Sequence, residues 1–267
     1  MLQTSLGWSS CALGHVGKVR KVNEDAYLDK PDIGLWAIAD GMGGHAAGDE
    51  ASQLIVANLD QINPQASLRD FMAEVEGALQ GAHRALVTAR KHLNNICGST
   101  VVALLAQGNR CAYLWAGDSR AYLFRGGRLT QLTTDHSQAE LYVQMGLMTP
   151  EEARGHPAAN QVTRAIGAGN ILRLDIGAVD IESGDRYLLC SDGLSKHITH
   201  HELAGSLAVG STAEVAQGLI DKTLLRGASD NVTVIVIDIH NARLREADMD
   251  KTNPHVSLDI PTTSNLP

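Results

Sequence analysis

The order of strand-like and helix-like segments restricts the possible folds of this chain more than any other feature of its sequence. Strand-like runs come first, at 8–16, 26–28 and 35–39, and a long helical region follows. That region starts with 46–59 and resumes at residue 67 after a turn. Strands then return, so the strict alternation of strand and helix that builds parallel sheets is absent. This order predicts an α+β fold in which antiparallel sheets pack against helices on their outer faces.

The second half of the chain continues this pattern and interrupts it once. Residues 136–170 are polar and poor in β-branched side chains, and 149–152 resemble a helix-capping sequence, so we expect an excursion with short helices there. Residues 211–225 form a predicted helix. Residues 241–267 have little periodicity, which predicts a mobile polar tail after one domain of residues 1–240. The remaining predicted strands are 99–106, 111–116, 121–124, 128–132, 172–179, 187–190 and 232–239.

The charge balance and the cysteines disfavour several classes of protein. The formal net charge is −8, so nonspecific binding of nucleic acid or of an anionic membrane is not expected. No apolar run approaches the roughly 18 residues of a membrane span, and no secretory signal is visible. The four cysteines show no Cys-x-x-Cys spacing and stand mostly in apolar stretches. We interpret them as reduced, buried thiols of a cytoplasmic protein.

Acidic residues stand where several apolar runs begin or end. Three apolar runs lead directly into an aspartate, a fourth aspartate lies on the turn before 232–239, and an acidic pair flanks 26–28. These acids are Glu24, Asp25, Asp40, Asp118, Asp192 and Asp230. A single Asp-Gly after a strand is usually only a turn. Because a buried strand fixes whatever stands at its end, the whole set favours carboxylates gathered at one edge of a sandwich.

Gathered carboxylates predict a metal site. They repel one another and cost free energy unless cations neutralise them. Ligands that are all oxygen suit hard ions, so Mg²⁺ or Mn²⁺ is the expected occupant. Zinc is disfavoured, because the eleven histidines show no His-Glu-x-x-His pattern and no pairing with cysteine at ligand spacing. Glycine after Asp40 and after Asp192 permits a tight turn and lets a backbone carbonyl join the coordination.

Two other interpretations of local motifs are disfavoured. Residues 41–46 match the Gly-x-Gly-x-x-Ala pattern of dinucleotide-binding loops. Asp40 directly before this loop would repel a pyrophosphate, and no second strand ending in an acid follows about 20 residues later. A cysteine-dependent phosphatase needs a thiolate beside an arginine. Cys190 is instead followed six positions later by Lys196, and no cysteine offers Cys-x₅-Arg spacing.

Seven short motifs follow one another along roughly residues 5–240. The motifs are Arg20-Lys21-Val22-Asn23-Glu24-Asp25, Asp40-Gly41-Met42-Gly43-Gly44-His45, Gly98-Ser99-Thr100, Ala116-Gly117-Asp118-Ser119-Arg120, Thr163-Arg164-Ala165-Ile166-Gly167, Ser191-Asp192-Gly193 and Ser229-Asp230-Asn231. Each motif alone is weak, and the ordered series is specific. In this order they resemble the motifs of metal-dependent protein phosphatases of type 2C, in the stand-alone bacterial form.

The resemblance implies a four-layer αββα sandwich, with two central antiparallel sheets flanked by helices and a metal centre at one end. By motif position, Asp40 would bridge two Mg²⁺ or Mn²⁺ ions and the Gly41 carbonyl would bind one of them. Asp192 and Asp230 would bind the other, and Asp118 with Asp192 would help to hold a third. The implied reaction is hydrolysis of phosphoserine and phosphothreonine esters by a metal-bound water.

The resemblance also implies roles outside the metal ligands. Glu24 and Asp25 would order metal-bound waters or ligate directly, and Arg20 would bind the substrate phosphate through bidentate hydrogen bonds. The excursion at 136–170 corresponds to a variable flap that influences substrate choice. Many eukaryotic members carry a histidine where this chain has Met42. His45, three residues later, is interpreted as structural or exposed and not as a general acid.

A phosphatase has two rivals. A catalytically inactive member of the same fold would act as a binding or sensing module, but it would be expected to lose metal-binding acids, and this chain keeps them. An active enzyme of the same fold could act on other phosphoesters, since the metal centre recognises the phosphate group and not the protein around it. If the substrates are phosphoproteins, the expected partner is an opposing Ser/Thr kinase encoded elsewhere, because no kinase signature occurs here.

Overall fold

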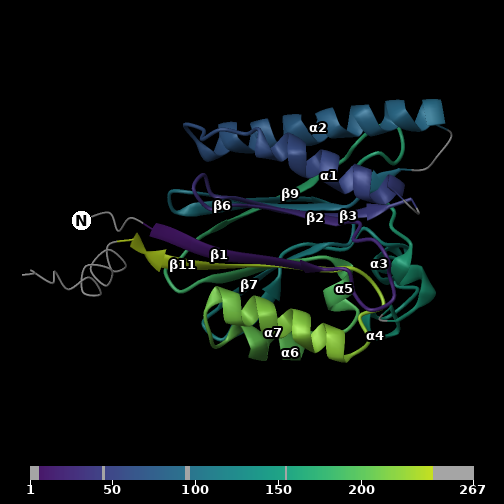
Figure 1. Cartoon of the computed structure of the whole chain (residues 1–267). Coiled ribbons are helices and arrows are strands. Elements are labelled where there is room, and N and C mark those ends of the chain that lie inside the picture. The colour runs from purple at the N-terminus through teal and green to yellow at the C-terminus, as the bar shows by residue number, and fades with distance from the viewer. Residues whose placement is uncertain (1–5, 44–45, 94–96, 154, 243–267) are drawn as a thin grey trace, which may run out of the picture.

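Two antiparallel sheets lie face to face between two layers of helices (Figure 1). The computed structural model describes residues 6–43, 46–93, 97–153 and 155–242. The first sheet has the order β1 (Leu6–His15), β11 (Val232–Asn241), β10 (Arg186–Cys190), β7 (Arg120–Arg125) and β8 (Arg128–Gln131). The second has the order β2 (Asp25–Lys30), β3 (Leu35–Met42), β5 (Val101–Gln107), β6 (Arg110–Ala116) and β9 (Asp175–Asp180), and the short β4 (Gly98–Ser99) pairs with β3.

Helices cover the outer face of each sheet. The second sheet packs against α1 (Ala46–Asp60) and α2 (Leu68–Leu93), and the first packs against α6 (His200–Leu207) and α7 (Thr212–Leu225), with the short α5 (Asp192–Ser195) at the end of β10 (Figure 1). The excursion holds α3 (Gln138–Gln144), α4 (Pro150–Ala153) and the 3₁₀ turn η1 (Pro157–Asn160). The predicted four-layer αββα sandwich is confirmed, and the excursion does contain short helices.

Each interface between layers has its own apolar core. Trp36 and Ile38 of β3 meet Leu189 and Ile235 of the opposite sheet in the central interface, and all four are fully buried. Their alternation with residues that face the helices follows from the two-residue period of a strand. Each buried side chain of this size contributes roughly 1.5–3 kcal/mol relative to an exposed one. The two sheets are thereby fixed against each other, and their ends are held in place.

Some predictions of local structure were incomplete. We did not predict α6, although Thr199 and Glu202 form a capping box at its start. Cys111 and Cys190 are buried as expected, whereas Cys11 and Cys97 are only half-buried, and all four are free thiols. Within the described ranges, no helix combines the length and apolarity that a membrane crossing requires. Most of the predicted polar tail and His45 lie outside the described residues.

Candidate active site

Asp25 and Asp40 are direct partners across the antiparallel pair β2 and β3. The same register continues through Ala26 and Ala39, so the two acids are placed by strand pairing and not by a flexible loop. Burial raises the pKa of Asp40 well above its ordinary value of 3.8, and the negative charges of neighbouring aspartates raise it further. Those neighbours are Asp25, Asp192, Asp118 and Asp230.

The backbone of Asp40 is held by the turn that follows β4. The Asp40 N–H donates to Thr100 Oγ1 at 3.2 Å, and the Thr100 N–H donates back to the Asp40 carbonyl at 2.9 Å. Ser99 Oγ also donates to that carbonyl at 3.0 Å. Thr100 Oγ1 further pairs with Ser119 Oγ at 2.8 Å, which links the start of β5 to the start of β7. The Gly98-Ser99-Thr100 motif therefore fixes the position of an acid.

The Asp25 carboxylate is buried and only partly satisfied. Ser191 Oγ and Thr233 Oγ1 donate to its Oδ2 at 2.8 and 2.7 Å. Its Oδ1 is buried without a hydrogen-bond partner among the described residues. Burial raises the pKa of Asp25 to about 7, against the opposing effect of the two hydroxyl donors. A carboxylate oxygen without a partner at this depth needs a ligand outside the protein to compensate its lost hydration.

Asp118 follows β6, where the chain crosses from the second sheet to the first. Burial raises its pKa to about 7, and the charges of Asp192 and Asp135 add to the shift. The preceding Gly117 has φ +123°, and a Cβ there would stand 2.5 Å from Thr100 Cβ. Only glycine allows this close crossing, because an L side chain would be strained and would clash.

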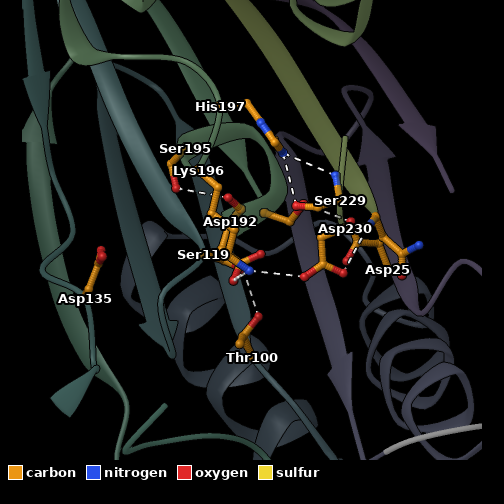
Figure 2. Close-up of polar contacts among 12 residues, drawn as sticks. Asp25, Thr100, Ser119, Asp135, Asp192, Ser195, Lys196, His197, Ser229 and Asp230 are labelled. Carbon is orange, nitrogen blue, oxygen red and sulfur yellow. Dashed lines mark hydrogen bonds and ion pairs between the residues drawn. The ribbon is translucent and has the colours of Figure 1, made fainter. Parts of the chain in front are cut away.

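Asp192 and Asp230 share one ammonium group (Figure 2). Lys196 Nζ lies 2.6 Å from Asp192 Oδ2 and 3.1 Å from Asp230 Oδ2. Burial raises the pKa of Asp192, and the charge and hydrogen bond of Lys196 oppose that shift. Burial lowers the pKa of Lys196, but the two carboxylates outweigh it, so the net shift is upward. These two acids and the lysine form one charge-compensated group.

The loop between β1 and β2 brings Arg20 and Glu24 to the same end. Arg20 Nε contacts Asp230 Oδ1 at 2.9 Å, and Arg20 Nη1 lies 3.9 Å from Glu24 Oε2. Asn231 fixes this loop, because its Oδ1 accepts the Glu24 N–H at 2.8 Å and its Nδ2 donates to the Val16 and Val22 carbonyls at 2.9 Å each. The Arg20 side chain is 48% exposed, so its guanidinium faces solvent at the edge of the acids.

Both glycines that follow a candidate ligand stand in close contact with backbone. A Cβ on Gly41 would lie 2.1 Å from the Gly48 carbonyl oxygen, and one on Gly193 would lie 1.8 Å from the Asn231 carbonyl oxygen. Neither glycine has a positive φ. Glycine is required at these positions because there is no room for a Cβ, and not because of the backbone conformation. Gly193 is the second residue of α5, and its close contact with Asn231 lies between Asp192 and Asp230 in the fold.

A buried histidine joins the flap to the turn that carries Asp118. His136 Nδ1 accepts the Gly117 N–H at 3.1 Å, and the His136 N–H donates to the Gly117 carbonyl at 2.9 Å. Burial lowers the pKa of His136, so the ring is neutral at pH 7 and carries its proton on Nε2, where Asp175 Oδ2 accepts it at 3.2 Å. Arg164 binds the other oxygen of Asp175 at 2.6 Å. His136, Arg164 and Asp175 line a pocket of about 210 Å³ under α3.

The residues present fit divalent cations by the chemistry of their donors. Burial and the charges of four neighbouring aspartates raise the pKa of Asp40, and one buried Asp25 oxygen has no partner among the described residues. In the described part of the chain, no three acidic, histidine or cysteine side chains are grouped closely enough to hold one ion in their present positions. Arg20 and Lys196 engage Asp192 and Asp230 in these positions.

The structure brings together every residue that the sequence nominated. Arg20, Glu24, Asp25, Asp40, Gly41, Asp118, Asp192 and Asp230 all lie at one end of the sandwich, joined by the contacts and charge interactions above. Sequence reasoning missed Lys196 as a member of this group. Its position four residues after Asp192, the spacing of neighbours on a helix, is the signal that could have found it. The sequence analysis also assigned no separate role to Asn231.

Comparison with known proteins gives matches over most of the chain. The family model described as Protein phosphatase 2C matches residues 17–226. Serine/threonine protein phosphatase PstP of Mycobacterium tuberculosis is 39% identical over 226 residues, which are 84% of this chain and 43% of PstP. The chain thus spans less than half the length of that relative. Protein phosphatase PhpP of Streptococcus pneumoniae is 34% identical over 245 residues, covering 85% of this chain and 96% of PhpP.

Solved structures share the fold as well as the sequence. PppA of Pseudomonas aeruginosa, described as a key regulatory component of T6SS, superposes with a TM-score of 0.82 at 41% identity and covers 87% of this chain and 98% of that chain. The catalytic domain of PstP, solved in complex with two manganese ions, superposes with a TM-score of 0.80 at 36% identity. That match covers 88% of this chain and 100% of the other.

Proposed function

The chain belongs to the protein phosphatase 2C family, and from that premise we propose that it is a metal-dependent protein serine/threonine phosphatase. It hydrolyses phosphoserine and phosphothreonine esters. The observation that carries this function is the convergence of Asp40, Asp118, Asp192 and Asp230 from separate strand ends, with a strongly raised pKa at Asp40. An inactive binding module would not need to retain buried carboxylates that repel one another.

The residues divide into ligands and supporting groups. Asp40 and the Gly41 carbonyl would hold one Mg²⁺ or Mn²⁺ ion, Asp192 and Asp230 would hold a second together with Asp40, and Asp118 with Asp192 would serve a third. Bound divalent cations supply positive charge that neutralises phosphate oxygens and lowers the pKa of water. Glu24 and Asp25 order water around this centre, and the Asp25 Oδ1 oxygen is available to accept a hydrogen bond.

Arg20 binds the substrate phosphate. Its guanidinium is half exposed and already lies against a carboxylate oxygen of Asp230, 2.9 Å away, at the rim of the acids. A planar guanidinium matches two phosphate oxygens, so a phosphate monoester entering here meets a bidentate donor in place of Asp230. Asn231 holds the loop at both ends of this segment and so sets where Arg20 stands.

The flap contributes to substrate choice. The pocket of about 210 Å³ under α3 contains Arg164, Asp175 and Asp135, and the charge of Asp135 also acts on Asp118. This pocket of mixed charge adjoins the acids and takes a side chain that neighbours the phosphorylated residue. A Ser/Thr kinase with opposing specificity supplies such phosphoproteins. The catalytic unit is the domain of residues 1–240.

A phosphatase assay tests this function. Purified protein is given a phosphothreonine peptide or p-nitrophenyl phosphate, with Mn²⁺, with Mg²⁺ or with excess EDTA, alongside Asp192→Asn. The expected result is phosphate release that requires metal, disappears in EDTA and is strongly reduced in the variant, with the peptide preferred. Folded protein that releases no phosphate with either metal would contradict the enzyme and favour the binding module.

A further inference from the structure

Lys196 is a basic residue within the group of acidic side chains at the candidate site. Its ammonium contacts one oxygen of Asp192 and one of Asp230, at 2.6 and 3.1 Å (Figure 2). The second Asp230 oxygen, Oδ1, accepts from Arg20 Nε and from the Asn231 N–H at 2.9 and 3.0 Å. Both oxygens of Asp230 and one of Asp192 are therefore engaged by groups of this chain itself.

The backbone fixes the base of the lysine, and the side chain reaches solvent on one side. Lys196 is the C-cap residue of α5, and its N–H donates to the Asp192 carbonyl at 2.9 Å. Its side chain is 30% exposed. A four-carbon stem with one exposed side can turn its ammonium toward water while its Cα stays in place. Lys196 can thus release the two carboxylates with no change in the fold.

The charge of Lys196 compensates a repulsion that the fold creates. Asp192 and Asp230 stand close enough for one ammonium to contact an oxygen of each, and their side chains are only 18% and 23% exposed. A cation between two such carboxylates lowers the energy of keeping them together. A divalent cation bound to the same oxygens would compensate the same repulsion between the carboxylates with twice the charge. The ammonium and the metal therefore have overlapping partners.

We propose that Lys196 competes with divalent metal for Asp192 and Asp230, holding the two carboxylates together before metal binds and raising the metal concentration that loading requires. The inference rests on the proposed role of these two aspartates as metal ligands. It makes Lys196 a positioning residue with opposite effects on two properties. It stabilises the chain without metal, and it weakens metal binding.

Calorimetric titration of Mn²⁺ into the full chain tests the proposal. Lys196→Met removes the ammonium and keeps the length of the stem, and Lys196→Gln provides a second neutral variant should the first fail to fold. Both are expected to bind Mn²⁺ about tenfold more tightly than the unchanged chain, which corresponds to about 1.4 kcal/mol. In EDTA, both are expected to unfold about 2–4 °C lower.

Two further variants separate position from charge. Lys222→Met removes an equal charge from α7, where the ammonium donates to Ser206, and is expected to keep the Mn²⁺ affinity of the unchanged chain. Lys196→Arg retains a cation and is expected to stay within about twofold of it. Equal or weaker Mn²⁺ binding by both neutral variants would overturn the competition. Folded, unchanged protein that binds no Mn²⁺ would overturn the ligand assignment beneath it.

Discussion

Asp25 stands directly opposite Asp40 where β2 pairs with β3, so strand register alone brings two carboxylates together. Like charges at facing positions of an antiparallel pair are destabilising. Two features of the fold offset this repulsion. The pairing of β2 with β3 continues to Lys30 and Leu35, and both faces of the sheet pack into buried cores. Two carboxylates held together in this way at one end of the sheet form a favourable site for a cation.

Asp40→Asn is expected to separate stability from metal binding. A neutral amide relieves the repulsion at a carboxylate whose pKa is raised by burial and by its neighbours, so the chain should gain at least about 1 kcal/mol of unfolding free energy in EDTA. Mn²⁺ binding should be lost. Thermal melts with EDTA and with Mn²⁺ measure both effects. Asp180→Asn, in an exposed pair with Arg110, is the control and should change stability by less than about 0.5 kcal/mol.

Stability in EDTA is expected to fall as the pH rises from 5.5 to 8. The pKa of Asp25 and of Asp118 is raised from 3.8 to about 7, so between these values the folded chain binds more protons than the unfolded chain. Stability from these protons is complete below about pH 4 and is lost as the pH passes 7. Thermal melts of Asp25→Asn should show a shallower decline.

Saturating Mn²⁺ should flatten the same decline, because the metal binds the ionised carboxylates. Melting temperatures that rise with pH in EDTA, or an equal slope in Asp25→Asn and the unchanged chain, would count against raised pKa values at these two acids.

Gly193→Ala is expected to be severely destabilising. The added Cβ would stand 1.8 Å from the Asn231 carbonyl oxygen, so α5 and the start of β11 must move apart. We expect a loss of about 2–4 kcal/mol and weaker Mn²⁺ binding, measured by denaturant unfolding and calorimetry. Gly205→Ala in α6 is the matched control, since its Cβ would meet nothing within 4 Å, and it should stabilise by about 0.5–1 kcal/mol.

Asn231→Ala is expected to raise KM for a phosphothreonine peptide more than it lowers kcat. The side chain makes three hydrogen bonds to backbone groups of Val16, Val22 and Glu24, so its loss frees the loop that positions Arg20 and costs about 1–3 kcal/mol. Steady-state kinetics at saturating Mn²⁺ measure the split. An unchanged KM with a reduced kcat would place Asn231 in the chemistry and not in substrate binding. Asn58→Ala on α1, which loses one bond to Leu54, is the control.

The sequence contained enough to predict the layers and the location of the site. Apolar runs such as 35–39 and 232–239 predict buried strands, which the structure contains. The positions of the acids follow from where such runs begin and end. Side-chain detail was harder. We predicted four buried thiols, yet Cys11 lies on the edge strand β1 and is only half-buried. An apolar run does not show whether its strand will stand at the edge of the sheet.

Interactions between distant parts of the chain were beyond reach of the sequence. The contacts of Asn231 span more than 200 residues, and no local pattern encodes them. The link from His136 to Gly117 and Asp175 likewise depends on how the flap folds back on the second sheet. Lys196 was visible as a helical neighbour of Asp192, but its contact with Asp230 needed the pairing of β10 and β11.

The central claim is that these converging aspartates hold the metal that makes the chain a phosphatase. Its most direct test is to titrate Mn²⁺ into the unchanged chain and into Asp40→Asn, while following bound metal and phosphate released from a phosphothreonine peptide. Phosphate release should rise in step with bound Mn²⁺ in the unchanged chain, and both should be absent in the folded variant. Turnover in EDTA, or turnover that survives Asp40→Asn, would contradict the claim.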